Sequence, residues 1–411
     1  MKEKVLALAL YKQSGRCYRL LESIFHLPSA RSLRQILNRI NVNTGCNQFI
    51  CRQLQEKGTT MSSIDKVCCV MFDEMAIQPH VEYDPVSDCI VGFEDCQTIR
   101  TMKYADHALV FMIRGIHTGW KFPVAYYFTE NQASTAHLVQ CNTIYLAGVE
   151  ICPLYDPPHL MKGIRNNLLN KDIELDFKNE GGMETEIGHL RMPVKQGHDT
   201  AEMALFFDRL FDSVNGHSVK PETELRSIVT RKSNHGEFWG SAIKKLSEMR
   251  FVSISTHCPV HTTPVLKHWQ ATIGGFQPLW QLLQRLGFKY FRPRYLNQDP
   301  LENFFGCIRS LNYRYTNPTA KHFKSNFKTL LVNNLSSKNS FGNCETICDG
   351  NLLLTFETLN TGTPNHNQEY PIENMLHQST PAISEQNNSV QNNFKKTYQL
   401  LLQHLPNICH T

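Results

Sequence analysis

The sequence contains no long hydrophobic run and fewer charged residues than an average soluble protein. Charged side chains make up 19% of its 411 residues, against about 25% in typical domains. No uninterrupted stretch reaches the roughly 18 apolar residues that form a transmembrane helix, so the sequence predicts no membrane partner. In the segment 1–16 a short apolar core runs into Lys12 and Arg16, which favours an amphipathic helix over a signal peptide.

The sequence also lacks the cysteine pairs of common metal and disulfide frameworks. Its 14 cysteines include no CxxC pair, which such sites usually contain. The adjacent Cys68 and Cys69 lie within an apolar run, so we expect buried, reduced thiols in an intracellular protein. A Walker-type glycine-rich loop is absent as well, and any nucleotide site would therefore be of an unusual kind.

Length and charge distribution indicate several domains and one basic region. A chain of 411 residues with 41% hydrophobic content exceeds what one core usually serves, so two or three domains are expected. The formal net charge is +5, yet residues 285–328 contain nine Lys or Arg and only two acids. This asymmetry predicts a surface that faces a polyanion.

Hydrophobic periodicity divides the chain into a helical start, a sheet and a second helical part. Residues 1–60 have helical spacing, and 66–75 form an apolar run typical of a strand. Three further apolar segments up to residue 129 predict an antiparallel meander whose first strand is central, followed by a helix near 134–147. A strand ending at Asp156 and a mostly helical region to Gly287 follow, with an expected helix break at Pro278.

The stretch NQDPLENFFGCIRSL, residues 297–311, predicts a helix with a carboxylate near its start. Asp299 and Pro300 suit the N-cap and first helical positions. A buried stripe at helical spacing is expected from Leu301, Phe304, Phe305 and Ile308. Glu302 falls beside this stripe, either as the partner of Asp299 in a capping box or as a functional carboxylate.

The order of these elements is that of ribonuclease H-like nucleic-acid enzymes, and five motifs resemble one family in particular. The family is that of the P-element transposases and their THAP-domain relatives. The matching segments are MFDEM (71–75), the strand motifs GFEDC, HALVFMIRGI and FPVAYYF, LYDPPHLMKGIRNNLL (154–169), LFFDRLFDSVNG (205–216) and RYLNQDPLENFFGCIR (294–309).

The resemblance implies a mixed α/β fold, an RNase H-like sheet flanked by helices and interrupted by a mostly helical insertion. The domains expected on this basis are an N-terminal helical region (1–60), the first part of the core (61–153), a GTP-binding-like insertion (154–290), the closing helices (291–355) and a low-complexity tail (356–411). The implied activity is cut-and-paste DNA transposition in the nucleus, by metal-dependent phosphodiester cleavage and strand transfer.

The family's site residues carry over to five positions. Asp73 is similar to the first metal-binding aspartate and Glu302 to the closing catalytic glutamate of a two-Mg²⁺ site. Asp156, Lys162 and Asp299 are similar to residues that contact the cofactor GTP. For Asp156 the residues alone leave a second interpretation open, since an aspartate before two prolines also suits a helix N-cap.

The sequence departs from the family where the second catalytic aspartate should stand. No aspartate occurs between Asp106 and Asp156, so about one strand and its helix are missing, and no zinc-coordinating THAP module is found. Either Asp156 has moved into the second metal position, or the site holds only Asp73 and Glu302. We favour the second alternative, because losing one carboxylate removes much of the charge of a two-metal site, and we expect impaired transposition.

DNA binding could persist without catalysis. The basic region interleaves aromatic residues with the predicted DNA contacts Arg292, Arg294, Arg309, Arg314 and Lys324, a mixture that suits phosphate contact and stacking. The competing interpretation is a non-enzymatic scaffold that binds DNA or nucleotide, or that pairs with a second copy of the chain or with an intact transposase.

Overall fold

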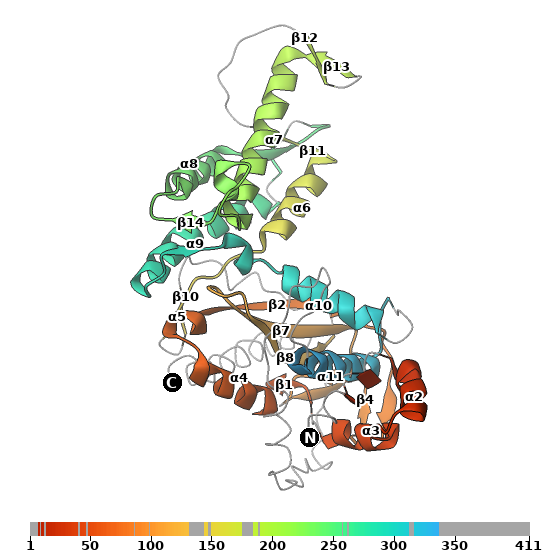
Figure 1. Ribbon diagram of the computed structural model, residues 1–411. Coiled ribbons are helices and arrows are strands. Elements are labelled where there is room, and N and C mark those ends of the chain that lie inside the picture. The colour runs from red at the N-terminus through yellow and green to blue at the C-terminus, as the bar shows by residue number, and fades with distance from the viewer. Residues whose placement is uncertain are drawn as a thin grey trace. The chain divides into compact units, whose positions relative to one another are not determined.

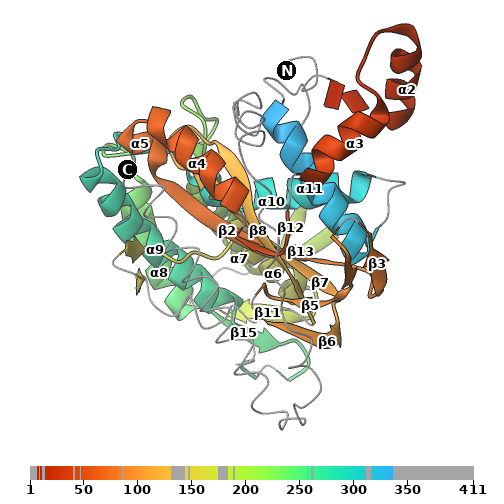
Figure 2. The same ribbon diagram turned by 90° about the horizontal axis from the view of Figure 1, so that it is seen from below.

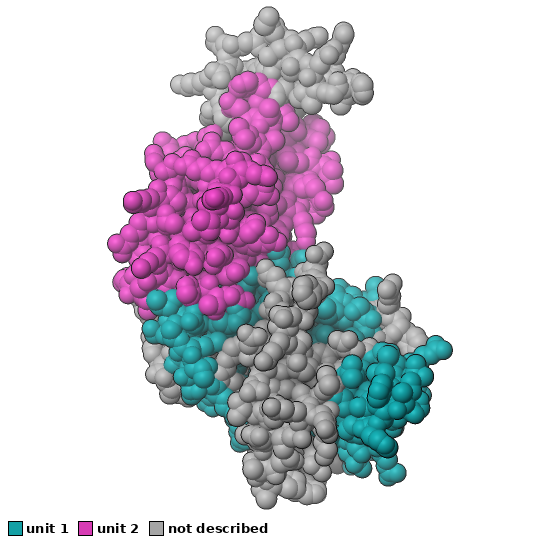
Figure 3. Space-filling view, in the orientation of Figure 1, with its two compact units in different colours: residues 1–114, 120–134, 298–411 teal, residues 115–119, 135–297 magenta. Residues whose placement is uncertain are grey.

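The chain folds into two compact units, which Figure 3 shows in different colours. The computed structural model describes residues 7–336 with gaps at 9, 12–13, 40–41, 47, 86, 98, 131–143, 147–148, 175–183, 188–189, 257, 261–262 and 312–315. Unit 1 comprises residues 1–114, 120–134 and 298–411, and unit 2 comprises 115–119 and 135–297. The tail predicted at 356–411 lies outside the described residues. Each unit is considered by itself.

Unit 1 combines an antiparallel sheet with helices from both ends of its sequence. Its helices are α2 (Gly15–Ile24), α3 (Ala30–Arg39), α4 (Gln48–Thr60), α5 (Ser63–Lys66), α10 (Asp299–Ser310) and α11 (Ala320–Ser336). Its strands are β1 (Gly45–Cys46), β2 (Cys68–Ala76), β3 (Glu82–Asp84), β4 (Cys89–Val91), β5 (Phe93–Asp95), β6 (Arg100–Tyr104), β7 (His107–Gly115) and β8 (Lys121–Thr129). The expected helical start is confirmed, and the predicted strands form. They do not make the expected meander, because β2 pairs with β7 and β8 pairs with β5.

The main sheet has the strand order β2-β7-β8-β5-β6, with β1 also paired to β8 (Figure 2). The first strand was expected to be central, but among the described strands β2 has β7 as its neighbour on one side and ends the order. The run predicted as a strand at 66–75 forms β2, which includes Asp73 and continues to Ala76. The site carboxylate therefore lies within an outer strand of the described sheet.

The core of unit 1 forms where the two longest hairpin strands meet α11. Every residue of β8 and eight of the nine residues of β7 are buried. The Tyr126 ring of β8 lies 5.3 Å from that of Phe323 and 4.8 Å from that of Phe327, both on α11. Such aromatic contacts add to the stabilisation that comes from burying large apolar surfaces. They hold the closing helices against this face of the sheet (Figure 1).

Unit 2 is mostly helical, with short two-stranded sheets. Its helices are α6 (Pro157–Leu168), α7 (Val194–Asn215), α8 (His235–Glu248), α9 (Val265–Arg285) and the 3₁₀ turns η1 (Glu224–Arg226) and η2 (Pro293–Leu296). Its strands are β9 (Ile144–Leu146), β10 (Val149–Ile151), β11 (Lys171–Glu174), β12 (Glu184–Ile187), β13 (Leu190–Pro193), β14 (Val229–Thr230), β15 (Arg250–Ser253) and β16 (Tyr290–Phe291). The helical character expected of this region is confirmed.

Two local expectations for unit 2 are wrong. Helix α9 passes through Pro278 without a break, because its buried face, which includes Trp269, Ile273 and Phe276, is held by tertiary packing that outweighs the lost backbone hydrogen bond. The helix expected near 134–147 does not include residues 144–146, which form β9 paired with β10. Its earlier residues lie outside the described part of the chain.

None of the described helices is long and apolar enough to cross a membrane. Cys68 and Cys69 of β2 form no disulfide among the described residues, and burial raises the pKa of Cys69 to about 11. This thiol is therefore neutral at physiological pH and a poor nucleophile.

Candidate functional site

The position of Asp73 follows from the pairing between β2 and β7. The N–H of Ile77 donates to the carbonyl of Asp106 at 2.8 Å, and these strands run antiparallel, because Cys69 contacts the carbonyl of Arg114 at their other end. Asp73 lies four residues before Ile77 along β2, and Val110 lies four residues after Asp106 along β7. Asp73 is therefore opposite Val110. Val110 in turn pairs with Tyr126.

Residues directly opposite one another in an antiparallel sheet point to the same face. Asp73 therefore shares a face with Tyr126, whose ring packs against Phe327 of α11. Phe327 also contacts Phe304 of α10, with ring centroids 5.5 Å apart. The candidate carboxylate of β2 thus points to the side of the sheet that α10 and α11 cover.

The start of α10 is attached to β2 immediately before Asp73. The side-chain amide of Gln298 donates to the carbonyl of Phe72 at 2.8 Å. Gln298 is also the N-cap residue of α10, and it makes no capping bond with its side chain. Asp299 was expected at the N-cap but already belongs to the helix, so the N-cap lies one position earlier. The capping-box alternative for Glu302 is therefore not the arrangement found. The helix start is tied to the sheet instead.

This attachment sets the position of Glu302 relative to β2. The N–H of Glu302 donates to the carbonyl of Gln298 at 3.0 Å, so the glutamate lies one helical turn, about 6 Å along the axis, from the anchored residue. Helix α10 packs against β2, and its predicted apolar stripe is buried as expected. Glu302 is exposed and Asp73 half-buried, so each carboxylate can be reached from solvent.

The described residues contain no further carboxylate in this region that completes a metal cluster. No group of three or more His, Cys, Asp or Glu side chains within the described ranges could hold a metal ion. Asp156 belongs to unit 2, where it does not end a strand, because β10 stops at Ile151. Its carboxylate instead caps α6 by accepting from the N–H of His159 at 3.1 Å. The N-cap interpretation of Asp156 is thus confirmed.

The three residues assigned to GTP by resemblance are divided between the units. Lys162 lies exposed on α6 of unit 2, beyond the N-terminus that Asp156 caps, while Asp299 begins α10 of unit 1. The Asp156 carboxylate also contacts the His159 ring nitrogen Nδ1 at 2.7 Å. Within unit 2, a helix N-terminus and a lysine are therefore the features suited to phosphate.

The predicted DNA contacts are likewise divided. Arg292 and Arg294 lie in unit 2 beside β16 and in η2, Arg309 lies on α10 of unit 1, and Arg314 falls outside the described residues. The Arg292 guanidinium lies over two aromatic rings, 5.3 Å from the centroid of Tyr290 and 5.6 Å from that of Tyr295. Such stacking holds an arginine in one orientation at the surface.

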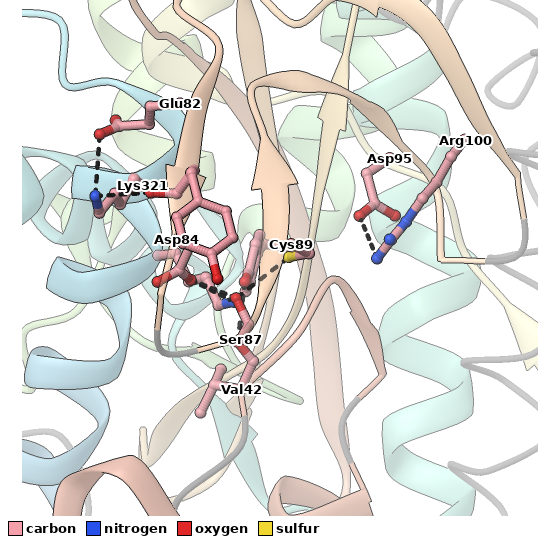
Figure 4. A network of polar contacts seen from close by, with 11 residues as sticks. Val42, Glu82, Asp84, Ser87, Cys89, Asp95, Arg100 and Lys321 are labelled. Carbon is pink, nitrogen blue, oxygen red and sulfur yellow. Dashed lines mark hydrogen bonds and ion pairs between the residues drawn. The ribbon is translucent and has the colours of Figure 1, made fainter. Parts of the chain in front are cut away.

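Lys324 has a structural partner that the sequence did not predict. Its ammonium group lies 3.2 Å from Asp84 and 2.9 Å from the hydroxyl of Ser87. Figure 4 shows Asp84 and Ser87 in this network, next to the ion pair between Glu82 and Lys321. The Lys324 side chain is only 18% exposed. Its contribution to DNA binding stays a prediction, and its ion pair with Asp84 argues against it.

Comparisons with known proteins find similarity over both RNase H-like segments of the chain. Residues 42–152 match the family model described as the TNP-like RNase H N-terminal domain, and residues 295–328 match the TNP-like RNase H C-terminal domain. The Transposable element P transposase of Drosophila melanogaster is 21% identical over 414 residues. The chain is a homologue of P-element transposases. The alignment covers 79% of this chain and 53% of that protein, so the homologue spans about half the length of its curated relative.

A solved structure shows that the fold is shared. The Drosophila P element transposase strand transfer complex matches with a TM-score of 0.66 at 16% identity, covering 83% of this chain and 92% of that chain. The RNase H-like mixed α/β fold is thereby confirmed. Along the sequence, one family-model match precedes most of unit 2 and the other follows it.

In this transposase homologue, sequence reasoning missed Gln298 as a site residue. The residue stands one position before the predicted helix start, where a side-chain cap was expected from Asp299 instead. A glutamine just before a helix carries no signal of its own, because a partner on a distant strand cannot be read from local spacing. The register of β2 was needed to find it.

Proposed function

We propose that this chain is a transposase-derived protein that binds DNA in the nucleus and holds a divalent cation between Asp73 and Glu302, with impaired strand cleavage and transfer. The observation that carries the proposal is the hydrogen bond from Gln298 to the residue preceding Asp73. It fixes a glutamate-bearing helix beside an aspartate-bearing strand of an RNase H-like sheet.

The donor chemistry suits Mg²⁺ or Mn²⁺. Both candidate ligands are carboxylates, the oxygen ligands that hard cations prefer, and Mg²⁺ is commonly bound by one or two carboxylates together with substrate phosphates. Two carboxylates are enough for one such ion. A two-metal site requires more, and the described residues contain no cluster of three. This supports binding of a cation together with weak catalysis.

The chain's own residues would position the cation rather than activate a nucleophile. A bound divalent cation supplies charge stabilisation to a phosphodiester oxygen. Asp73 is held by the backbone of β2, and Glu302 by the first turn of α10. Rigid anchors of this kind keep two carboxylates converging without a reorganisation cost when DNA arrives. Neither residue has a described neighbour that would act as the third carboxylate.

A cleavage assay on supercoiled DNA with Mn²⁺ tests the proposal. We expect at most slow nicking, lost in Asp73→Asn and Glu302→Gln but retained in the control Asp88→Asn, which alters a carboxylate in the turn between β3 and β4. Mn²⁺ binding should disappear in the same two variants. Rapid strand cleavage by the native protein, or cation binding unaffected by either variant, contradicts the proposal.

GTP binding is the second part of the proposal. It is supported by Lys162 near the N-terminus of α6, since the positive end of the helix dipole favours phosphate. The capping role of Asp156 limits what that carboxylate adds. A non-enzymatic DNA-binding scaffold is the alternative function. It is favoured because no group of three or more possible metal ligands occurs among the described residues.

A further inference from the structure

The two edges of β2 can be distinguished from its pairing. In an antiparallel pair, the N–H and C=O of alternate residues point to the same edge of a strand. Ile77 donates toward β7. Phe72 lies five residues earlier, an odd number, so its carbonyl points to the opposite, outer edge of β2. This is the carbonyl that accepts from the side-chain amide of Gln298 at 2.8 Å.

A second contact confirms the direction of the outer edge. Gln78 is one residue beyond Ile77 and therefore points outward as well. Its N–H donates to the carbonyl of Pro318 at 3.0 Å, and it forms a parallel bridge with Thr319. The segments on either side of α10 are thus both attached along the outer edge of β2, before Asp73 and after it.

Gln298 by itself connects β2 with α10. Its side chain binds β2, and its own carbonyl accepts the N–H groups of Leu301 at 2.8 Å and of Glu302 at 3.0 Å. Only one helical turn of backbone separates the anchored amide from the candidate glutamate. Any shift of Gln298 along β2 would therefore move Glu302 relative to Asp73 by a similar amount.

We propose that Gln298 is a positioning residue that sets the separation of the Asp73 and Glu302 carboxylates. The proposal rests on the proposed function for the cation, and goes beyond it by assigning a specific task to a residue outside the ligand set. Residues that orient metal ligands without touching the metal typically change its affinity by about 10- to 100-fold when they are replaced.

The test compares two glutamines that make the same kind of bond. Gln298→Met keeps length and volume but cannot donate to Phe72. Gln270→Met is the matched control, because the Gln270 amide donates to the carbonyl of Leu246 at 2.7 Å within unit 2. We expect Gln298→Met to weaken Mn²⁺ binding about tenfold in isothermal titration. Gln270→Met should leave the affinity unchanged.

Hydrogen exchange on the same full-length variants separates this proposal from the one on which it rests. In Gln298→Met, faster exchange should be confined to the first turn of α10 and to β2, and in Gln270→Met to α8 and α9. If the native protein binds no Mn²⁺, the proposed function fails, while exchange still decides whether Gln298 fixes α10. Native exchange of α10 in Gln298→Met, or native Mn²⁺ affinity in a variant that otherwise binds the ion, overturns the positioning role.

Discussion

The Lys324 ammonium of α11 lies 3.2 Å from the Asp84 carboxylate of β3, and the two side chains are only 18% and 7% exposed. This ion pair, with Ser87 as a further partner, attaches α11 to the hairpin formed by β3 and β4. Because α11 packs against α10, the pair also supports the helix that carries Glu302.

Removing the positive charge of Lys324 should destabilise unit 1. Lys324→Met leaves a buried carboxylate without its ion partner, which costs about 3 kcal/mol. Lys321→Met is the control, since its pair with Glu82 is 36% and 24% exposed and should be worth about 1 kcal/mol or less. Urea-dependent hydrogen exchange of α11 peptides measures both losses. Equal losses would show that burial of the Asp84 pair is unimportant.

Unit 2 should lose stability in mild acid because of His235. Burial lowers the pKa of this histidine below its ordinary value of 6.5, although its bond to the Leu225 carbonyl and the charge of Glu224 act in the opposite direction. Its Nδ1 has no hydrogen-bond partner among the described residues. Unfolded protein therefore binds a proton more readily, and stability falls as pH drops from about 6.5 toward the lowered pKa.

Tryptophan fluorescence during urea unfolding measures this effect, since three of the four tryptophans (239, 269 and 280) lie in unit 2. In His235→Gln, whose amide can still donate to the Leu225 carbonyl, the unfolding midpoint should depend less on pH between 5 and 7. A native midpoint that is constant across this range would be inconsistent with the buried neutral histidine.

Local pattern was enough to predict the elements of the site but not their connections. The stripe beginning at Leu301 has helical periodicity, and the run before Asp73 has the length and composition of a strand, so both elements could be predicted. The outer position of β2 depends on its pairing with β7, and the Gln298 bond joins residues 226 positions apart. Lys324 was read as a surface cation for the same reason, because its partner Asp84 lies 240 positions away.

The glycine that ends the motif LFFDRLFDSVNG should be required for packing. A Cβ atom at Gly216 would lie 2.2 Å from the carbonyl oxygen of Ser227 and 2.9 Å from the carbonyl carbon of Arg226. Both are backbone atoms that cannot move aside as a side chain does, so we expect Gly216→Ala to cost about 3 kcal/mol.

Gly240→Ala, in the interior of α8, is the matched control for that substitution. Its new methyl group would meet only the Gln277 amide at 4.0 Å, so the helix should gain about 0.5–1 kcal/mol. Fluorescence-detected urea unfolding of unit 2 compares the two variants. A mild effect of Gly216→Ala would mean that the segment from Arg226 to Ser227 can move.

Nucleotide binding can be separated from helix capping at Asp156. Asp156→Ser keeps an oxygen acceptor for the first turn of α6 but removes the charge. With GTP and Mg²⁺ in isothermal titration, we expect weak binding that survives Asp156→Ser, is lost in Lys162→Ala, and is retained in the control Arg165→Ala on the same helix. Loss of binding in Asp156→Ser with α6 intact would show that the carboxylate contacts the nucleotide directly.

DNA binding by unit 2 should depend on Arg292 in two ways. The guanidinium carries a charge that can release one counterion from DNA, and its stacking on Tyr290 and Tyr295 fixes its orientation. Arg292→Ala should therefore weaken binding and reduce the slope of log affinity against log salt by about 1. Arg292→Lys should recover the slope but only part of the affinity, because an ammonium group cannot stack as a planar guanidinium does.

Fluorescence anisotropy with duplex DNA at several salt concentrations measures both quantities. Lys244→Ala, on the exposed face of α8, is the control for general loss of charge. An affinity independent of salt, or equal effects of Arg292→Ala and Lys244→Ala, would remove Arg292 from the DNA-binding surface.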